Sequence, residues 1–246
     1  MDHYGLIGNP VSHSLSEKYF NDKFMLEDID ARFERFLLND IHGLPQLLDA
    51  YPGLKGLSVT SPFKTGVIGY CTELDETAAK VRAVNTLKIS REGNKLAIKG
   101  YNTDVDGFSA ALLPLLGNKK PDALILGSGG AARAVAFAMN RLGINYKVVS
   151  RTPEKGVITY PELTHKVVSS HKLIINATPL GMGRFINQYP LIPYQHLGSG
   201  HLLFDLIYNP PETPFMEKGI RKKAQVENGL VMLQAQAEKA WEKWKD

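Results

Sequence analysis

Apolar residues in the first part of the chain fall into short runs separated by polar turns. Runs at residues 4–7, 33–38 and 56–60 have the length and composition of strands and are bounded by turn residues. Between them, apolar residues recur near helical spacing after residue 16 and again over residues 41–51, so helices are expected there. This alternation predicts an α/β arrangement from the beginning of the chain.

The next segment predicts a hairpin followed by a helix. Strands are expected at residues 84–89 and 95–99, because a glycine-containing turn at residues 92–94 separates them. A polar turn at residues 100–104 then precedes an apolar helix over residues 108–116. Residues 61–64, directly after the third strand, are expected to open a helix.

A second alternating unit begins after residue 121. An alanine-rich helix ends near Leu142, and an amphipathic stretch at residues 231–244 predicts a terminal helix. Alternating strands and helices predict a parallel sheet with right-handed crossovers. The strands of this second sheet are expected at residues 123–126, 146–149, 157–160, 173–176 and 202–205.

Composition narrows the class of protein. The 246 residues suit one large domain or two small ones, and 43% hydrophobic with 22% charged residues indicates a globular protein rather than a disordered or fibrous one. The net charge is +4, but lysines and arginines are scattered, so we expect no nucleic-acid partner. The seven histidines show no metal-ligand spacing, so no metal is expected.

The single cysteine and the apolar runs bear on the compartment. Cys71 has no partner for an internal disulfide, and a reducing, cytoplasmic location is therefore expected. The first residues lack the basic and apolar segments of a signal peptide, and no run approaches the roughly 18 apolar residues of a membrane span. We therefore expect no membrane association.

A glycine-rich turn follows the first strand of the second unit. Gly127, Gly129 and Ala132 match the strand–GxGxx(G/A)–helix fingerprint, in which a helix N-terminus and close backbone approach bind a pyrophosphate. The same turn also occurs for purely structural reasons. The residue after the next strand is Arg151, where NAD enzymes carry an acid; an arginine there pairs with a 2′-phosphate and favours NADP, unless it is an ordinary surface residue.

Polar loops in the first unit hold candidate substrate and catalytic groups. Ser14 and Ser16 either bind a carboxylate or cap a helix, and capping is the more common function of serine. Thr60 ends a strand, and Lys64 stands where a helix dipole disfavours a cation. Lys64 therefore either points to solvent or is held by a counter-charge, for which Asp104 is the candidate.

Together these motifs resemble the shikimate dehydrogenase family. The match is spread in order along nearly the whole chain, and no single motif is specific. It rests on residues 8–10 with 12–16, 59–64, 83–86, 102–107, the turn at Gly127, 150–152, 176–179, Tyr208, Thr213-Pro214, 228–230, Met232-Leu233 and Gln236.

The resemblance implies the reversible NADPH-dependent reduction of 3-dehydroshikimate to shikimate in aromatic amino-acid biosynthesis. Lys64 and Asp104 would be the catalytic pair. The substrate would be held by Ser14, Ser16, Thr60, Asn85, Tyr208 and Gln236. The cofactor would be bound by Gly127, Gly129, Gly130, Ala131, Ser150, Arg151, Thr152, Thr178 and Gly229.

The implied fold is an N-terminal α/β substrate domain followed by a Rossmann-like, doubly wound parallel-sheet domain. The expected bounds are residues 1–103 and 104–228, with a C-terminal helix at 229–246 that returns to the first domain and an active site in the cleft between domains. The expected partner is the small-molecule substrate, and the expected state is a monomer or homodimer.

The chain departs from the family pattern at three places. Glu17 replaces the usual proline, and Ser150 replaces an asparagine that contacts the 2′-phosphate. Residues 152–173 are too short for the usual helix, strand and helix, so the helix beside the adenine pocket is expected to be missing, with Lys155 as a second charge. The alternatives are a quinate/shikimate dehydrogenase and a non-catalytic dinucleotide-binding regulator, which would need neither Lys64 nor Asp104.

Overall fold

The computed structural model describes residues 1–12, 14–93 and 95–245, and the chain forms two compact units. Unit 1 comprises Met1–Asp104 with Gln236–Asp246, and unit 2 comprises Val105–Ala235. These divisions differ from the expected ones by one residue at the first crossing, which places Asp104 in unit 1, and by seven at the second. Among the described residues, no helix is both long and apolar enough to span a membrane.

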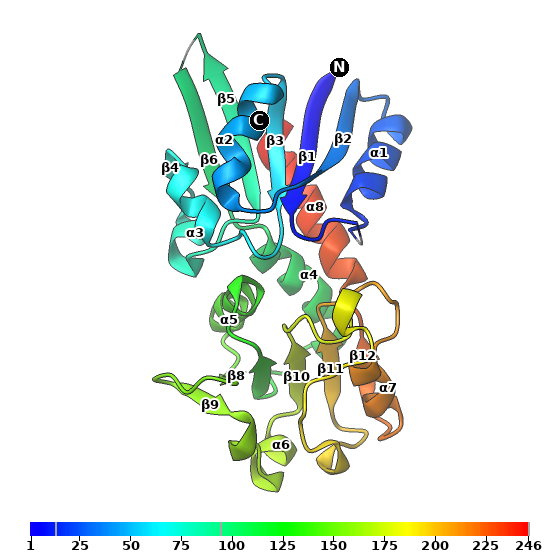
Figure 1. Ribbon diagram of the computed structural model, residues 1–246. Coiled ribbons are helices and arrows are strands. Elements are labelled where there is room, and N and C mark those ends of the chain that lie inside the picture. The colour runs from blue at the N-terminus through cyan, green and yellow to red at the C-terminus, as the bar shows by residue number, and fades with distance from the viewer. Residues whose placement is uncertain (13, 94, 246) are drawn as a thin grey trace. The chain divides into compact units, whose positions relative to one another are not determined.

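Unit 1 is built on a mixed six-stranded sheet in the order β2-β1-β3-β5-β6-β4 (Figure 1). Its strands are β1 (Asp2–Gly8), β2 (Ala31–Leu37), β3 (Leu54–Val59), β4 (Glu73–Leu74), β5 (Thr86–Glu92) and β6 (Lys95–Tyr101). The first three strands are parallel, whereas β5 runs antiparallel to both β3 and β6. The predicted hairpin is therefore present; its Asn94 lies outside the described residues.

The helices of unit 1 follow the predicted pattern with one correction and one addition, the short helix α3, which was not predicted. They are α1 (Ser16–Leu26), the 3-10 helix η1 (Ile41–Gly43), α2 (Leu44–Ala50), the 3-10 helix η2 (Gly66–Tyr70) and α3 (Glu76–Val81). The prediction that a helix opens at residues 61–64 is wrong, because that segment consists of turns. Gly66 and Gly69 lower the helix propensity of the residues that follow, and only the 3-10 helix forms.

The end of helix α8 (Leu230–Lys245) packs into the core of unit 1. Trp244 stacks on Tyr4 with ring centroids 5.1 Å apart, and its indole N–H donates to the Leu87 carbonyl at 2.9 Å. The indole also lies where a side chain on Gly56 would point, so only glycine fits on β3 at that position. The last residues of the chain are thereby fixed against the sheet, with Gln236 at the start of this segment.

Unit 2 is built on a six-stranded, fully parallel sheet in the order β12-β11-β10-β7-β8-β9 (Figure 1). Its strands are β7 (Ala123–Leu126), β8 (Tyr146–Ser150), β9 (Val157–Thr159), β10 (Leu173–Asn176), β11 (Leu202–Asp205) and β12 (Gln225–Glu227). All residues of β7, β10 and β11 are buried, as expected for strands covered on both faces. The prediction of a parallel sheet is confirmed, and only β12 was not predicted.

The helices after β6 lead into or connect these parallel strands, except at one place. They are α4 (Asp104–Leu116), α5 (Gly130–Leu142), η3 (Tyr160–Glu162), α6 (His165–Ser170), η4 (Gly183–Phe185), η5 (Tyr194–His196) and α7 (Pro214–Ile220). Only bends and a turn join β8 to β9, at the place where a helix was expected to be missing, whereas η3 and α6 lie in the later part of residues 152–173. α5 ends at Gly143, whose φ of +64° suits the left-handed C-terminal cap.

Candidate active site

The topology of unit 1 brings four loops to one edge of its sheet. β1 and β3 end there together, because Ile7 pairs with Val59 in parallel register. β5 begins at the same edge and β6 ends there, since Thr86 pairs with both Ser58 and Tyr101 in antiparallel register. The polar residues that follow β1, β3 and β6, and those that precede β5, therefore converge.

Lys64 and Asp104 meet at this edge. The Lys64 Nζ donates to Asp104 Oδ2 at 2.5 Å, and the two side chains are 18% and 6% exposed. The Lys64 carbonyl accepts from the Val84 N–H at 2.7 Å, which holds the loop after β3 against the chain entering β5. The counter-charge expected for Lys64 is thus Asp104, and the Lys64 side chain is not fully buried.

Asn85 connects the pair to the rest of the edge. Its Oδ1 accepts from the Thr103 backbone N–H at 2.8 Å, and because a backbone N–H can only donate, this contact orients the amide. The Asn85 Nδ2 must then donate, and it reaches Asp104 Oδ1 at 2.9 Å and Gln236 Oε1 at 3.2 Å. Asp104 is therefore held from one side by Lys64 and from the other by Asn85.

Two buried threonines complete this arrangement, and our sequence reasoning did not select them. The Thr86 hydroxyl donates to Asn85 Oδ1 at 3.1 Å, and the Thr103 hydroxyl accepts from Asn85 Nδ2 at 3.0 Å. Thr86 is 0% exposed and Thr103 2% exposed. Their positions next to Asn85 and Asp104 in the chain were the available signal, but the contacts depend on how β5 and β6 pair.

The loop after β1 supplies Ser14 and Ser16. The Ser14 hydroxyl accepts from the Ser16 backbone N–H at 3.2 Å and donates to the Ser16 hydroxyl at 3.1 Å. The N-cap residue of α1 is Leu15, so Ser14 satisfies a free amide near the helix start and capping explains part of its role. His13, part of the family motif, lies outside the described residues.

Thr60 lies between the serine loop and the Lys64 loop. Its methyl group fills the space beside Gly8, where no other residue would fit, and the Asn9 N–H donates to the Ser61 carbonyl at 3.0 Å. The loops after β1 and β3 therefore pack directly on one another. Among the described residues, neither Ser14 nor Ser16 hydrogen-bonds to the Lys64–Asp104 pair, so unit 1 brings these groups to one edge without linking them.

The remaining substrate candidates come from two places. Gln236 lies on α8 within unit 1 and joins the Asn85 network. Tyr208 lies in unit 2, half-buried in the loop that follows β11. All predicted catalytic and substrate residues except Tyr208 thus belong to unit 1.

The carboxyl edge of the unit 2 sheet has the features of a phosphate-binding turn. Gly127 has a φ of +115°, and a Cβ there would lie 3.0 Å from the Ala177 carbonyl oxygen, so only glycine is accommodated. Gly129 is the N-cap of α5, and the space a side chain would occupy there is open. With no side-chain cap and no acid in its first turn, the start of α5 presents its amides and dipole to an anion.

The residues after β8 form the neighbouring part of this edge. Ser150 is 8% exposed, and its hydroxyl lies 3.4 Å from the Ser128 hydroxyl and accepts from the Thr152 N–H at 3.3 Å. Arg151 is exposed. Burial raises the pKa of Tyr160, and the positive charge of Arg151 opposes that rise. A buried hydroxyl beside an exposed guanidinium fits a phosphate-bearing nucleotide better than the bare ribose diol of NAD.

Two further residues that were predicted to bind the cofactor are held in place by local contacts. The Thr178 hydroxyl donates to Asn176 Oδ1 at 2.6 Å, which fixes the loop after β10. Gly229 is buried, its N–H donates to the Ile207 carbonyl at 3.0 Å, and the Leu206 carbonyl leaves no space for a side chain on it. Close backbone approach thus explains why Gly229 is a glycine.

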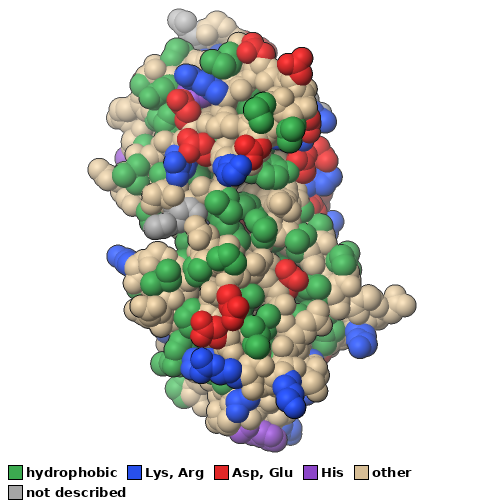
Figure 2. All heavy atoms as spheres, turned by 90° about the vertical axis from the view of Figure 1, so that its right-hand side faces the viewer, with side chains coloured by type: hydrophobic (Ala, Val, Ile, Leu, Met, Phe, Trp, Pro, Cys, Tyr) green, Lys and Arg blue, Asp and Glu red, His purple; other side chains and the backbone are tan. Residues whose placement is uncertain are grey.

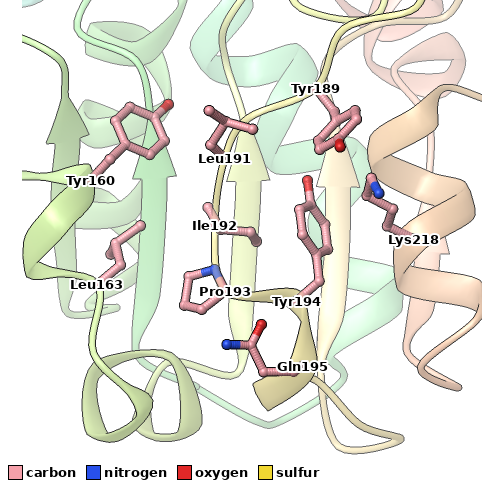
Figure 3. A pocket seen from close by; sticks show the side chains of 9 residues that line it. All are labelled: Tyr160, Leu163, Tyr189, Leu191, Ile192, Pro193, Tyr194, Gln195 and Lys218. Atoms are coloured by element: carbon pink, nitrogen blue, oxygen red, sulfur yellow. The ribbon is translucent and has the colours of Figure 1, made fainter.

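A separate hollow of about 410 Å³ lies on unit 2, over one face of its sheet (Figure 3). The Lys218 Nζ sits 4.0 Å from the Tyr189 ring centroid and 5.5 Å from that of Tyr194. Of the described residues that line this hollow, none carries a carboxylate to pair with that cation. It offers no acid–base pair like Lys64–Asp104, which makes the edge of unit 1 the candidate active site.

Within the described part of the chain, charged and metal-ligating side chains do not indicate a second functional site. On the face in Figure 2, basic and acidic side chains are interspersed rather than segregated. No cluster of three or more His, Cys, Asp or Glu side chains among the described residues is arranged to hold a metal ion. Burial raises the pKa of the Cys71 thiol to about 11, so this partly buried cysteine is unreactive at neutral pH.

Comparison with known proteins identifies the family. Residues 6–87 match the shikimate dehydrogenase substrate-binding domain. A shikimate dehydrogenase (NADP(+)) from Archaeoglobus fulgidus is 36% identical over 268 aligned positions, covering 99% of this chain and 93% of that protein. The chain belongs to the shikimate dehydrogenase family.

Solved structures agree with this assignment. A shikimate dehydrogenase in complex with NADP+ is 32% identical, has a TM-score of 0.87, and covers 99% of this chain and 90% of its own. The shikimate dehydrogenase of Thermus thermophilus, in complex with NADP(H) and shikimate, is 28% identical with a TM-score of 0.86, covering 99% and 93%. The predicted fold class, a substrate domain with a Rossmann-like domain, is therefore confirmed.

Proposed function

We propose that this chain catalyses the reversible NADPH-dependent reduction of 3-dehydroshikimate to shikimate in aromatic amino-acid biosynthesis. The observation that carries the proposal is the contact between Lys64 and Asp104 at 2.5 Å, oriented by Asn85 in the unit that matches a shikimate dehydrogenase substrate-binding domain. Family membership supports the same reaction, because relatives over nearly the full length are named for it.

Reduction of the ketone needs a hydride and a proton. A bound nicotinamide would supply the hydride, and the carbonyl oxygen that gains negative charge would then need a proton. The Lys64 ammonium stabilises that oxygen and donates its proton, and in shikimate oxidation the neutral amine accepts the hydroxyl proton. Asp104 holds the Lys64 Nζ in place, so the acid is positioned before the substrate arrives.

The other polar groups of unit 1 hold the substrate. We propose that Ser14 and Ser16 bind its carboxylate, with Thr60 beside them, and Tyr208 of unit 2 stays a predicted substrate residue. Asn85 and Gln236 are within hydrogen-bond reach of each other and are proposed, with the catalytic pair, to bind the ring hydroxyls. Serine hydroxyls suit this role because they donate to a carboxylate without adding a competing charge.

The cofactor site is proposed to lie along the carboxyl edge of unit 2. Backbone amides at Gly129, Gly130 and Ala131 would bind the pyrophosphate, which the open space at Gly129 supports. Arg151, with Ser150 and Thr152, would bind the 2′-phosphate of NADP. Thr178 and Gly229 would line the site from the neighbouring loops. The residue directly after β8 is Arg151 rather than the acid that would bind the two ribose hydroxyls of NAD, which favours NADP.

An assay of shikimate and quinate oxidation, each with NADP and with NAD, tests the proposal. We expect reduction of NADP with shikimate as the preferred combination, and little or none with quinate. Equal rates with quinate would favour the quinate/shikimate alternative. NADP binding without turnover of either acid would favour the regulatory alternative, which the intact Lys64–Asp104 pair argues against.

The cellular compartment and the oligomeric state of the enzyme are also part of the proposal. A single cysteine whose thiol is unreactive at neutral pH suits a reducing compartment, and we propose that the enzyme acts in the cytoplasm as a monomer or homodimer. Sedimentation of the purified chain would determine its oligomeric state.

A further inference from the structure

A carboxylate stands at the end of the otherwise apolar strand β11. Asp205 is 0% exposed and accepts hydrogen bonds from Asn176, Ile207 and Thr213. Its Oδ1 accepts from Asn176 Nδ2 and from the Ile207 backbone N–H, each at 3.0 Å. Its Oδ2 accepts from the Thr213 hydroxyl at 2.6 Å. These donors come from the end of β10, the loop after β11 and the start of α7, so one carboxylate links three segments of unit 2.

Keeping this carboxylate buried is costly. Burial raises the pKa of Asp205 to about 6, and the hydrogen bonds from Thr213, Ile207 and Asn176 oppose the rise. No cationic side chain among the described residues lies within ion-pair distance of it, and its charge contributes to raising the pKa of the nearby Tyr194. A well-packed apolar residue is often more stable than a buried ion, so its presence here calls for a role beyond stability.

The contacts lead from Asp205 to the phosphate-binding turn. Asn176, held through its amide nitrogen, accepts through Oδ1 from the Thr178 N–H at 3.1 Å and the Thr178 hydroxyl at 2.6 Å. The loop so fixed places the Ala177 carbonyl against Gly127, the first glycine of the turn. A shift of Asn176 therefore moves both Thr178 and the backbone that packs on Gly127.

A second branch runs from Asp205 to α7. The Thr213 hydroxyl that donates to Asp205 also accepts from the Met216 N–H at 3.4 Å and so caps α7. Thr213 packs on Gly181, where a side chain would come within 3.1 Å of it, at the far end of the loop after β10. The same loop is thus held at both ends through Asp205.

We propose that Asp205 is a positioning residue for the dinucleotide: it clamps the loops after β10 and β11 and the start of α7 so that Thr178 and the Gly127 turn keep their binding geometry. This inference rests on the proposed use of NADP. Asp205 itself is fully buried and acts through the groups that donate to it, among them Asn176, Ile207 and Thr213. Breaking the clamp should therefore weaken NADP binding while leaving the acid–base pair of unit 1 unchanged.

The test compares three variants of the full-length chain by NADP affinity, measured by fluorescence titration at a temperature where each is folded. Asp205→Leu removes every acceptor and should weaken NADP binding by at least about tenfold. Asp205→Asn keeps one oxygen as acceptor for Asn176 and Ile207 and donates to Thr213, so its affinity should stay within about threefold of wild type. Leu203→Ala, a buried change on the same strand, controls for general loss of stability.

Amide hydrogen exchange of the apo protein gives a second readout that does not depend on activity. Exchange over residues 177–182 and 206–213 should rise in Asp205→Leu and remain low in Asp205→Asn. If Asp205→Leu does not fold, Thr213→Val takes its place, with Thr213→Ser expected to restore the affinity.

The possible results separate the clamp from the proposed function. The clamp is overturned if Asp205→Leu or, in its place, Thr213→Val binds NADP within about threefold of wild type, or if Leu203→Ala weakens binding as much. A wild-type chain that binds no NADP overturns the proposed function instead, before any variant is compared. A loss confined to the clamp variants, reversed by the conservative ones, supports the inference.

Discussion

The two sheet edges that carry the candidate chemistry are built in opposite ways. The edge of unit 1 is made of side chains: Lys64 and Asp104 are 18% and 6% exposed and are already paired, with Asn85 holding the carboxylate. The edge of unit 2 presents backbone amides at an uncapped helix start and an exposed Arg151. Acid–base chemistry depends on side chains held in one geometry, whereas binding a long anion depends on amides and a cation that it can reach.

The difference predicts which kinetic parameter each edge controls. A change in the Lys64 cluster removes groups that act on the reacting oxygen and should lower kcat. A change at Arg151 or the Gly127 turn alters cofactor binding in ground and transition states alike, and should raise KM or Kd with kcat preserved. Four sets of variants test this separation.

The largest effect is expected for Lys64→Ala. Removing the ammonium removes both the proton donor and the charge that stabilises the developing oxyanion, so kcat should fall at least about a hundredfold. NADP affinity, measured by fluorescence titration, should be nearly unchanged because the phosphate turn belongs to unit 2. A variant with near-normal kcat would remove Lys64 from the chemistry, and one that loses NADP affinity would break the separation of the two edges.

Asp104→Ala should lower kcat by a similar factor, because Lys64 then loses the partner that positions it. The two residues form one unit, so the double variant should be little worse than the poorer single variant. The measurement is kcat for both singles and the double under saturating substrate. Losses that simply add would show that Lys64 and Asp104 act independently and that their contact at 2.5 Å is not functionally coupled.

The two edges also differ in how far the sequence alone predicts them. In unit 2 the local pattern was sufficient: the strands at 173–176 and 202–205 have the predicted bounds, and the Gly127 turn lies where the fingerprint placed it. These features depend on neighbours in the chain, such as glycines, apolar runs and the residue after a strand. The short helices α6 and α7 and the three-residue strand β12 were missed because each is too short to show a clear apolar period.

In unit 1 the candidates were predictable but their arrangement was not. Lys64 and Asp104 are 40 positions apart, and Asn85 and Gln236 join them only through the pairing of β5 with β6 and the return of α8. The resemblance to a family supplied Asn85 as a substrate residue, whereas the structure shows that it also orients Asp104. Asp205 gave one signal, an acid that ends an apolar strand, but its donors become visible only in the folded chain.

A smaller effect, on the cofactor, is expected for Arg151→Ala. Losing a charge-assisted pair should weaken NADP binding by about 1.5–3 kcal/mol, or roughly ten- to a hundredfold, and should leave NAD affinity almost unchanged. Titrating both cofactors into wild type and variant provides the comparison, with kcat at saturating NADP expected to be preserved. Equal losses for NADP and NAD would mean that Arg151 does not bind the 2′-phosphate.

The smallest effect is expected for Ser14→Ala and Ser16→Ala, which test whether unit 1 also holds a pure binding element. Each hydroxyl would contribute one of several hydrogen bonds to the substrate carboxylate, and the remaining serine still donates. Each variant should therefore raise KM for shikimate by about two- to tenfold with kcat unchanged, since the contact is equal in ground and transition states.

The melting temperature tests the alternative, in which the serines only cap helix α1. Ser14 accepts from the Ser16 N–H near the start of α1, so some loss of stability is expected for Ser14→Ala alone. A Ser14→Ala enzyme that melts earlier with normal KM would assign that serine to capping only. Ser16→Ala is the cleaner test, because the Ser16 hydroxyl accepts only from Ser14 among the hydrogen bonds of the described residues. A normal KM there would remove the serine pair from substrate binding.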